Sequence, residues 1–396
     1  MSVRVPLNLH SLCTEVMPPF LLFYGFNVLA TYGPSTMAYR VGLLPVILFS
    51  AHRAAVGVDL TRLVRPDNPG TAGMVNQAFV LMMWFIAARS LTRTISSTTP
   101  IRRGSATRRS TVQVALDAAD LTFNLRAVGW NISRGTKLPP HTRCTASRTR
   151  FSWQTFVSLV THLLLSDLFH YSFQLLGPTT FTTPLGGSMY DTTVQSPFLK
   201  QLRIDALIVL HGLIIYCTVQ MFHDACALVA VGVFRQDALE WPPIFDRPWL
   251  ATSLTDFWSY RWHQTFREEF ILLGSKPLAS LAGPAAGVLG AFLMSGLLHY
   301  ITVWALDQVA DKRIALFFVA MAVGVIFEKI WAQKTGRRVE GHWGRLWTWS
   351  WLLAFGRFFV EAYCLSGLLG NEIFPWEQRP AIFLYRLIDF VRLYPH

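Results

Sequence analysis

The stretch AGPAAGVLGAFLMSGLLHYITVW, residues 282–304, decides the fold class of this chain. This apolar run is long enough to cross a bilayer, for which a helix needs about 20 residues. One ionisable side chain, His299, interrupts it. Burying an ionisable group at membrane depth costs free energy, so His299 indicates a functional site, unless it only forms a hydrogen bond between helices. Ser295 and Gly296, one helical turn earlier, leave room for another helix or for a substrate.

The composition also indicates a membrane protein. Of the 396 residues, 52% are hydrophobic and 15% are charged, whereas an average soluble domain has about 25% charged residues. We therefore predict an all-α fold, a polytopic integral membrane bundle of about eight transmembrane helices with amphipathic helices at the interface. The predicted spans are Met17–Thr31, Val41–Val58, Met74–Ala88, Trp153–Leu176, Ile204–Val233, Leu278–Trp304, Ile314–Trp331 and Leu346–Leu369.

The net charge of +12 predicts membrane topology rather than nucleic-acid binding. Many of the arginines fall in the polar stretch Ser90–Arg150, and loops rich in Lys and Arg stay cytoplasmic. No nucleic-acid-binding motif accompanies the charge. Pro18 and Pro19 interrupt the first apolar run, which argues against a signal peptide. We expect a multi-pass protein of the endoplasmic reticulum membrane.

The chain is predicted to form a single domain over residues 1–396, with a motif-bearing core at residues 241–306. Its five cysteines show no CxxC pair, so we predict neither a disulfide framework nor a metal site. An amphipathic piece, Thr111–Trp130, is expected to lie on the bilayer surface or to pack against the bundle.

A second informative stretch is WLATSLTDFWSYRWHQTFR, residues 249–267. Aromatic residues recur at three- and four-residue spacing from Ser253 to Phe266, which predicts an amphipathic helix. Ser253 or Thr255 is expected to cap it, with Asp256 near its positive end. Arg261 is expected to pair with Asp256, although a spacing of three or four residues would suit an α-helix better.

Together these two stretches resemble the membrane-bound O-acyltransferase superfamily, and in particular its wax-synthase-like branch. The resemblance is carried by Arg261-Trp262-His263-Gln264 and by the SGLLHY segment that contains His299. It implies that His299 is the catalytic residue. His263 stands where many relatives have asparagine, and the resemblance gives it a second catalytic role, against a structural hydrogen bond as the alternative.

The resemblance also implies which residues meet the substrates. The motif residues that would bind substrate are Asp256, Trp258, Arg261 and Trp262. Apart from the resemblance, Arg267 and Lys276 are cations expected near the cytosolic side, where they would contact the phosphates of coenzyme A, as would Arg261 if it does not pair with Asp256. The alternative is that they are interfacial cations reaching the lipid headgroups.

The implied reaction is O-acylation of an alcohol by an acyl-CoA, with histidine as general base and no tightly bound cofactor. The divergent motif and compact length favour acetyl-CoA as co-substrate and a hydroxylated terpenoid or meroterpenoid secondary metabolite as acceptor. Long-chain wax-ester synthesis from fatty acyl-CoA and fatty alcohol is the alternative within the family.

An alternative of another class is a polytopic transporter. It would use His211, His223, Asp224 and His299 along a polar path. This alternative leaves the stretch at residues 249–267 unexplained, and no repeat-related broken helices are visible in the sequence.

Overall fold

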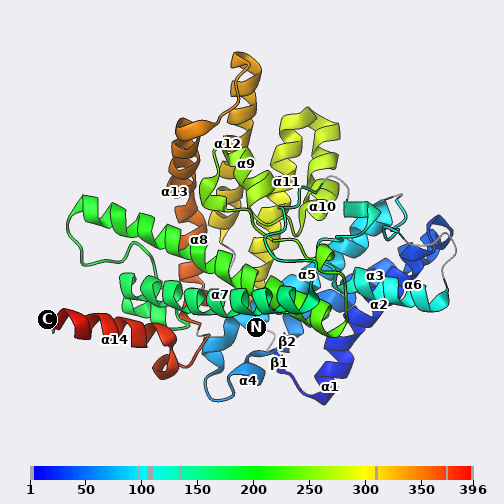
Figure 1. The fold of residues 1–396 in the computed structure, drawn as a ribbon, viewed down its shortest axis with the longest axis horizontal. Coiled ribbons are helices and arrows are strands. Elements are labelled where there is room, and N and C mark those ends of the chain that lie inside the picture. Colours follow the sequence, from blue (N-terminus) through cyan, green and yellow to red (C-terminus); the bar gives the residue numbers. More distant parts are fainter. Residues whose placement is uncertain are drawn as a thin grey trace. The chain divides into compact units, whose positions relative to one another are not determined.

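The computed structural model describes residues 4–96, 98–104, 110–133, 136–307, 311–371 and 373–393, and this part of the chain is mostly helical (Figure 1). It divides into two compact units. The first comprises residues 1–69, 73–137 and 264–338, and the second comprises residues 70–72, 138–263 and 339–396. The predicted all-α fold is confirmed, and the single domain over the whole chain stays a prediction.

The first unit contains a short parallel strand pair among its helices. Its elements are β1 (Val5–Pro6), α1 (Leu9–Ser11), η1 (Leu12–Val16), α2 (Met17–Thr31), η2 (Pro34–Thr36), α3 (Met37–Gly57), β2 (Val58–Asp59), α4 (Thr61–Val64), α5 (Gly73–Ile95), α6 (Thr111–Phe123), η4 (Asn131–Ser133), α10 (Arg267–Glu269), η10 (Phe270–Ser275), α11 (Lys276–Asp307) and α12 (Lys312–Thr335).

The second unit is built on three long helices, α7, α8 and α13. Its elements are α7 (Arg148–Leu176), η5 (Thr179–Thr182), α8 (Pro197–Leu228), η6 (Val229–Val233), η7 (Ala238–Glu240), η8 (Pro248–Leu250), α9 (Leu254–Asp256), η9 (Phe257–Arg261), α13 (Gly341–Leu365), η11 (Leu368–Gly370), η12 (Trp376–Gln378) and α14 (Pro380–Leu393). The helix η3 (Pro69–Ala72) lies where the chain passes between the units.

All eight predicted spans fall on helices. Among the described residues, five helical stretches are long and apolar enough to cross a membrane. They are Leu9–Thr31, Gly73–Ile95, Pro197–Val233, Arg267–Ala305 and Lys312–Thr335. The helices α3, α7 and α13 do not meet both conditions. The polytopic helical architecture is therefore confirmed, whereas the number of eight crossings stays a prediction.

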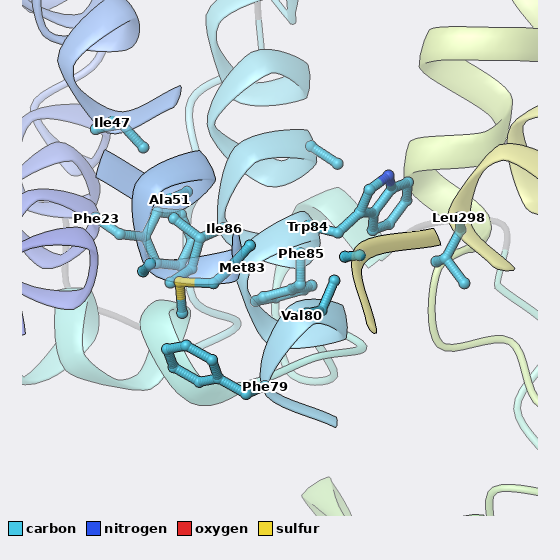
Figure 2. Packing of buried hydrophobic residues seen from close by; sticks show 14 of the residues in the cluster. Phe23, Ile47, Ala51, Phe79, Val80, Met83, Trp84, Phe85, Ile86 and Leu298 are labelled. Atoms are coloured by element: carbon cyan, nitrogen blue, oxygen red, sulfur yellow. The ribbon is translucent and has the colours of Figure 1, made fainter. Parts of the chain in front are cut away.

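The core of the first unit gathers side chains from α2, α3, α5 and α11. Phe23, Ile47, Met83 and Phe85 are almost completely buried there, and Leu298 of α11 joins them (Figure 2). Phe266, just before α10, packs its ring edge-on against Trp84 with centroids 5.6 Å apart. This core holds the helix that carries His299 against α5.

The predicted span Leu278–Trp304 is not one continuous helix, which corrects the sequence-based prediction. The backbone leaves the helical region at Ala282 and at Gly283, whose φ is +82°. Gly283 tolerates this conformation because it has no Cβ, and Pro284 disfavours a helical residue before it. Beyond the break the chain turns back, so Arg267–Leu281 and Pro284–Asp307 form the two arms of a helical hairpin (Figure 1).

Glycines let the two arms of this hairpin touch through their backbones. A Cβ at Gly274 would overlap the carbonyl of Gly290, and one at Gly290 would overlap the carbonyl of Gly274. The first arm is shorter than the about 20 residues needed to cross a bilayer. Leu281 at the tip is 84% exposed.

The amphipathic piece predicted at Thr111–Trp130 is helical only as far as Phe123, in α6. Ser110 caps α6 through the amide of Gln113, and Thr122 accepts a 3.0 Å hydrogen bond from Asn27 of α2. Beyond α6 the chain turns back, and Trp130 donates to Asp120 over 2.6 Å. The expected packing of α6 against the bundle is confirmed. The cytoplasmic location of the arginine-rich stretch that contains α6 stays a prediction.

Candidate functional site

His299 lies on the second arm of the hairpin, with its ring packed flat against Phe318 of α12. The ring centroids are 5.2 Å apart and the ring planes are inclined by 16°. Gly296 permits this approach, because a Cβ there would lie only 3.3 Å from the Cβ of Phe318. The hydrogen-bonding directions of an imidazole lie in its ring plane. Stacking therefore fixes the ring plane of His299 without using either nitrogen.

The residues on either side of His299 fix the helix that carries it. Leu298 is 2% exposed and belongs to the core of the first unit. Thr302 donates a 2.9 Å hydrogen bond from its hydroxyl to the carbonyl of His299. His299 itself is half-buried. Its ring is thus held on the side of the arm that meets α12, while the adjacent residue faces the core.

The motif of the second unit is built on a π-helical turn. Ser253 caps α9 by accepting from the amide of Asp256 over 2.9 Å, as predicted. The chain then forms the π-helical turn η9, in which the amide of Trp262 bonds the carbonyl of Phe257, five residues back. A π-helix places residues five apart above one another. This explains why Arg261 reaches Asp256, with 2.6 Å between Nε and Oδ2.

The predicted helix ends earlier than the sequence pattern suggests. Trp262 is extended, with φ −80° and ψ 147°, so the expected helix to Phe266 is wrong beyond Arg261. Arg261 donates to the carbonyl of Asp246 over 3.1 Å, and the amide of Asp246 donates back to the carbonyl of Arg261 over 3.0 Å. These bonds to an upstream loop replace the next helical turn.

Aromatic rings pack against His263 and against the turn that precedes it. Trp262 stacks on Phe257 with centroids 5.3 Å apart and planes inclined by 17°. Phe245 meets Trp262 edge-on at 5.0 Å and His263 edge-on at 5.8 Å. Trp258 packs edge-on against Phe257 at 4.9 Å. His263 therefore presents its imidazole just after the turn, against the rings of Phe245 and Trp262.

Arg267 and Lys276 both lie on the first arm of the hairpin. Arg267 begins α10 and is half-buried, whereas Lys276 begins α11 and is exposed. Arg261 has a different setting, because both Asp246 and Asp256 lie within 4 Å of its guanidinium. Among the predicted phosphate contacts, Lys276 is thus the most accessible cation.

The predicted residues fall into two groups. His299, Arg267 and Lys276 belong to the first unit, whereas His263 and the other motif residues belong to the second. The structure links Asp256 to Arg261 and Trp258 to Trp262, and Trp262 packs against His263. A joint active site that combines both groups stays a prediction.

Sequence reasoning missed a buried ion pair next to the motif. Arg89 of α5 donates from Nε to Glu269 of α10, and both side chains are almost fully buried. Arg89 also donates to the carbonyl of Leu125 over 3.0 Å and lies 4.8 Å from the ring centre of Phe85. The available signal was an arginine near the end of one apolar run and a glutamate at the start of another. A buried charge in a membrane bundle requires a partner of opposite charge.

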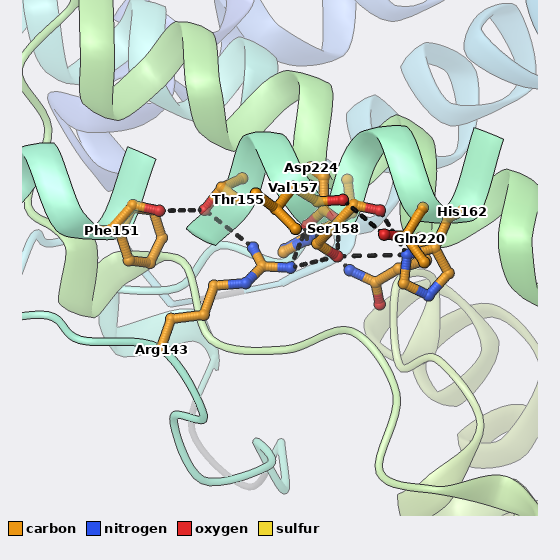
Figure 3. Close-up of polar contacts among 10 residues, drawn as sticks. Arg143, Phe151, Thr155, Val157, Ser158, His162, Gln220 and Asp224 are labelled. Carbon is orange, nitrogen blue, oxygen red and sulfur yellow. Dashed lines mark hydrogen bonds and ion pairs between the residues drawn. The ribbon is translucent and has the colours of Figure 1, made fainter. Parts of the chain in front are cut away.

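A second polar network lies in the interior of the second unit (Figure 3). Asp224 of α8 is fully buried and accepts from Arg143 at 2.7 Å, from Ser158 of α7 at 2.6 Å and from Gln220 at 2.9 Å. The ring of His223 lies 3.6 Å from the same carboxylate. The carboxylate is thus neutralised and hydrogen-bonded within the network, as expected of a structural group.

His211, more than three turns away along α8, has different surroundings. Phe173, Phe359 and Tyr363 pack around its ring, with centroids 5.3–6.2 Å away. Neither ring nitrogen has a hydrogen-bond partner among the described residues. The residues proposed for a transport path therefore have unlike settings, and His299 belongs to the other unit.

No group of three or more His, Cys, Asp or Glu side chains that could hold a metal ion occurs in the described part of the chain. The absence of a metal in the reaction remains a prediction.

Comparison with known proteins finds a family likeness in the part of the chain that carries the candidate site. The profile of the membrane bound O-acyl transferase family matches residues 241–320. The acetyltransferase spyB of Aspergillus fumigatus is 31% identical over 119 residues, which are 28% of this chain and 20% of that protein. The O-Mevalon transferase yanI of Aspergillus niger is 24% identical over 393 residues, 86% of each chain. Residues 241–320 of this chain are thus similar to the membrane bound O-acyl transferase family.

A plant relative extends the membrane bound O-acyl transferase likeness beyond fungi. The probable long-chain-alcohol O-fatty-acyltransferase 8 of Arabidopsis thaliana is 30% identical over 160 residues, 38% of this chain and 45% of that protein. The family profile covers the motif around His263, the hairpin with His299, and Phe318. The predicted resemblance to a family of acyl-transferring enzymes is therefore confirmed.

Proposed function

We propose that this protein transfers an acetyl group from acetyl-CoA to a hydroxyl of a terpenoid or meroterpenoid secondary metabolite. The match of residues 241–320 to the membrane bound O-acyl transferase family supports acyl transfer. The names of the fungal relatives support an acetyl donor. The hydrophobic surroundings of the helices suit a hydroxylated, water-insoluble acceptor. No tightly bound cofactor is needed, because a thioester is already electrophilic.

In the proposed reaction His299 acts as general base. Its neutral imidazole takes the proton of the acceptor hydroxyl as the oxygen attacks the carbonyl carbon of acetyl-CoA. The carbon–sulfur bond then breaks, and the leaving thiolate receives the proton from the imidazolium. The products are the acetate ester and coenzyme A. General-base assistance of this kind contributes about 10²–10⁴ in rate.

One observation carries the assignment of His299: an ionisable ring stacked on Phe318 within a membrane-associated helical hairpin. The stack fixes the ring plane, and a fixed plane is what a proton acceptor needs to meet a hydroxyl in one direction. The same side chain would be a costly choice for simple packing at this depth.

The remaining residues take binding roles in the proposal. His263 donates a hydrogen bond to the acyl carbonyl as negative charge develops on it. Asp256 and Arg261 hold the π-helical turn, and Trp258 and Trp262 line the acyl or acceptor site. Arg267 and Lys276 contact the phosphates of coenzyme A.

The test uses microsomes that contain the expressed protein, radiolabelled acetyl-CoA, and a panel of alcohols consisting of farnesol, ergosterol and hexadecanol. We expect labelled ester from a terpenoid alcohol, at a rate at least about 100-fold above that of His299→Ala. Immunoblotting of the membrane fraction controls for the amount of each protein. Absence of ester with every donor and acceptor would contradict the proposal.

A second candidate is long-chain wax-ester synthesis, which the name of the Arabidopsis relative favours. The two candidates differ in the donor pocket, because extra methylenes must find space in a packed interior. Palmitoyl-CoA with hexadecanol replaces acetyl-CoA with farnesol in the same assay. Faster turnover of palmitoyl-CoA would favour the wax-ester candidate and overturn the acetyl donor.

We further propose that the protein acts in the endoplasmic reticulum membrane, in agreement with its apolar helices. A fluorescent fusion should follow a marker of that membrane. Accumulation at the plasma membrane instead would contradict this location.

A further inference from the structure

Arg4 bonds to the ends of two helices. Its Nη1 donates to the carbonyl of Val58 over 2.9 Å, and its Nη2 donates to the carbonyl of Ala55 over 3.1 Å. Nη2 also donates to the carbonyl of Ala305. Ala55 lies in the last turn of α3, and Ala305 lies in the last turn of α11, the helix of His299. One guanidinium thus joins two C-terminal helix ends.

A cation stabilises a helix most at its C-terminal end. The last four carbonyls of an α-helix have no partner within the helix, and the end carries a partial negative charge. Ala305 is 5% exposed, so water does not readily replace the missing partner. A guanidinium offers several donors in a rigid plane, which suits several carbonyls better than an ammonium does.

The segment that carries Arg4 is itself fixed. β1 pairs in parallel with β2, and the amide of Leu7 donates to the carbonyl of Asp59 over 3.0 Å. The carboxylate of Asp59 accepts from Thr61 at 2.7 Å and from Asn76 of α5 at 2.9 Å. The segment of Arg4 is therefore anchored by the strand pair to the residues that follow α3. The carboxylate of Asp59 connects this strand pair to α5.

The charges of Asp59 and Arg4 also contribute to this anchor. Burial alone would raise the pKa of Asp59, but its hydrogen bonds with Thr61 and Asn76 and the positive charge of Arg4 lower the pKa on balance. Asp59 is thus held as a carboxylate near the guanidinium. We call Arg4 with its three acceptor carbonyls the Arg4 clamp.

We infer that Arg4 is a positioning residue for His299, an inference that rests on the proposed function. The second arm of the hairpin is bounded by the turn at Gly283 and, beyond His299, by the Arg4 clamp at Ala305. Between them it is held by packing and by the stack on Phe318. A displacement of a catalytic group by about 1 Å costs about 100-fold in rate. The clamp restricts sliding and rotation of this arm.

Kinetics of Arg4→Gln test the inference with acetyl-CoA and the panel alcohol that is turned over fastest. Arg4 is assigned no substrate contact, so we expect kcat to fall about tenfold or more while KM for acetyl-CoA changes less than about twofold. Arg4→Lys should recover part of kcat, because an ammonium can satisfy some of the carbonyls. Arg62→Gln, at an exposed arginine of α4 in the same unit, should leave both constants unchanged.

Hydrogen exchange supplies a readout that does not depend on activity. In Arg4→Gln, amides of the last turns of α3 and α11 should exchange faster, while those of α12 should keep their protection. If His299→Ala retained activity, the assignment of His299 as general base would fail, yet exchange would still show whether the clamp exists. Unchanged exchange in Arg4→Gln would overturn the clamp. Faster exchange with unchanged kcat, or an equal loss of kcat and of affinity for acetyl-CoA, would overturn the positioning role.

Discussion

The imidazole of His299 lies flat on the ring of Phe318, with centroids 5.2 Å apart and planes inclined by 16°. The two residues come from different helices, α11 and α12, and Gly296 makes the approach possible. Stacking on a ring restricts rotation of the imidazole about its side-chain bonds. This geometry makes Phe318 a test of how tightly the proposed base must be held.

Phe318→Leu should lower kcat about tenfold with little change in KM for acetyl-CoA, because the base keeps its chemistry but loses its fixed plane. Leucine keeps much of the apolar volume, which limits the loss of stability. Phe317→Leu is the matched control, since Phe317 is buried next to Phe318. Equal effects of the two substitutions would show that only packing is being measured.

His299→Ala should lower turnover at least about 100-fold while membrane insertion is retained, because the change removes a polar group from an apolar helix. In the wild type the rate should fall as the pH is lowered, since a protonated imidazole cannot accept the hydroxyl proton. The residual activity of His299→Ala should lack this acid limb. A well-inserted variant that keeps more than about a tenth of the wild-type rate would exclude His299 as the base.

His263→Ala should reduce kcat by about 10²–10³ if the ring donates to the acyl carbonyl. His263→Asn should retain more activity, because a carboxamide also donates a hydrogen bond. Thermal unfolding in detergent, measured on both variants, separates catalysis from stability. Indistinguishable kinetics of the two variants would argue for a structural role of the imidazole.

Gly290→Val should destabilise the hairpin, because its arms meet at Gly274 and Gly290 through their backbones. Overpacking at such a site costs about 1–3 kcal/mol. The control is Gly42→Ala in α3, where a Cβ has open space. That change should be neutral or stabilising by up to about 1 kcal/mol. Equal midpoints of thermal unfolding for Gly290→Val and the wild type would contradict the hairpin contact.

Protease added to sealed microsomes should cut within Ser90–Arg150 if that arginine-rich region is cytosolic. A control with detergent-opened microsomes shows that the sites are cleavable at all. Protection in sealed vesicles, or a glycan on Asn131, would reverse the predicted orientation.

Hydropathy and spacing were sufficient for much of the fold. The helical segments, the cap at Ser253 and the pairing of Asp256 with Arg261 are local features, and each depends on residues close in the sequence. The break at Gly283 was missed because an apolar window averages over the single glycine that turns the chain back.

Contacts between residues far apart in the sequence could not be predicted from the sequence. The pair Arg89–Glu269 and the Arg4 clamp join positions far apart in the sequence, and neither leaves a periodic pattern. The end of the helix at Arg261 also depends on distant residues, since the loop at Asp246 takes up the hydrogen bonds of the next turn.

The π-helical turn at Phe257–Arg261 has a consequence for how relatives are aligned. Its closing hydrogen bond joins residues five apart, whereas the hydrogen bonds of an α-helix join residues four apart. The turn therefore contains one residue more than an α-helical turn. Deleting a single residue between Asp256 and Arg261 would convert the turn to an α-helical one and rotate Trp262 and His263 away from Phe245. The turn therefore fixes the spacing between the acidic residue and the arginine at five positions, with tryptophan next. Chains that keep this turn can be recognised by that spacing.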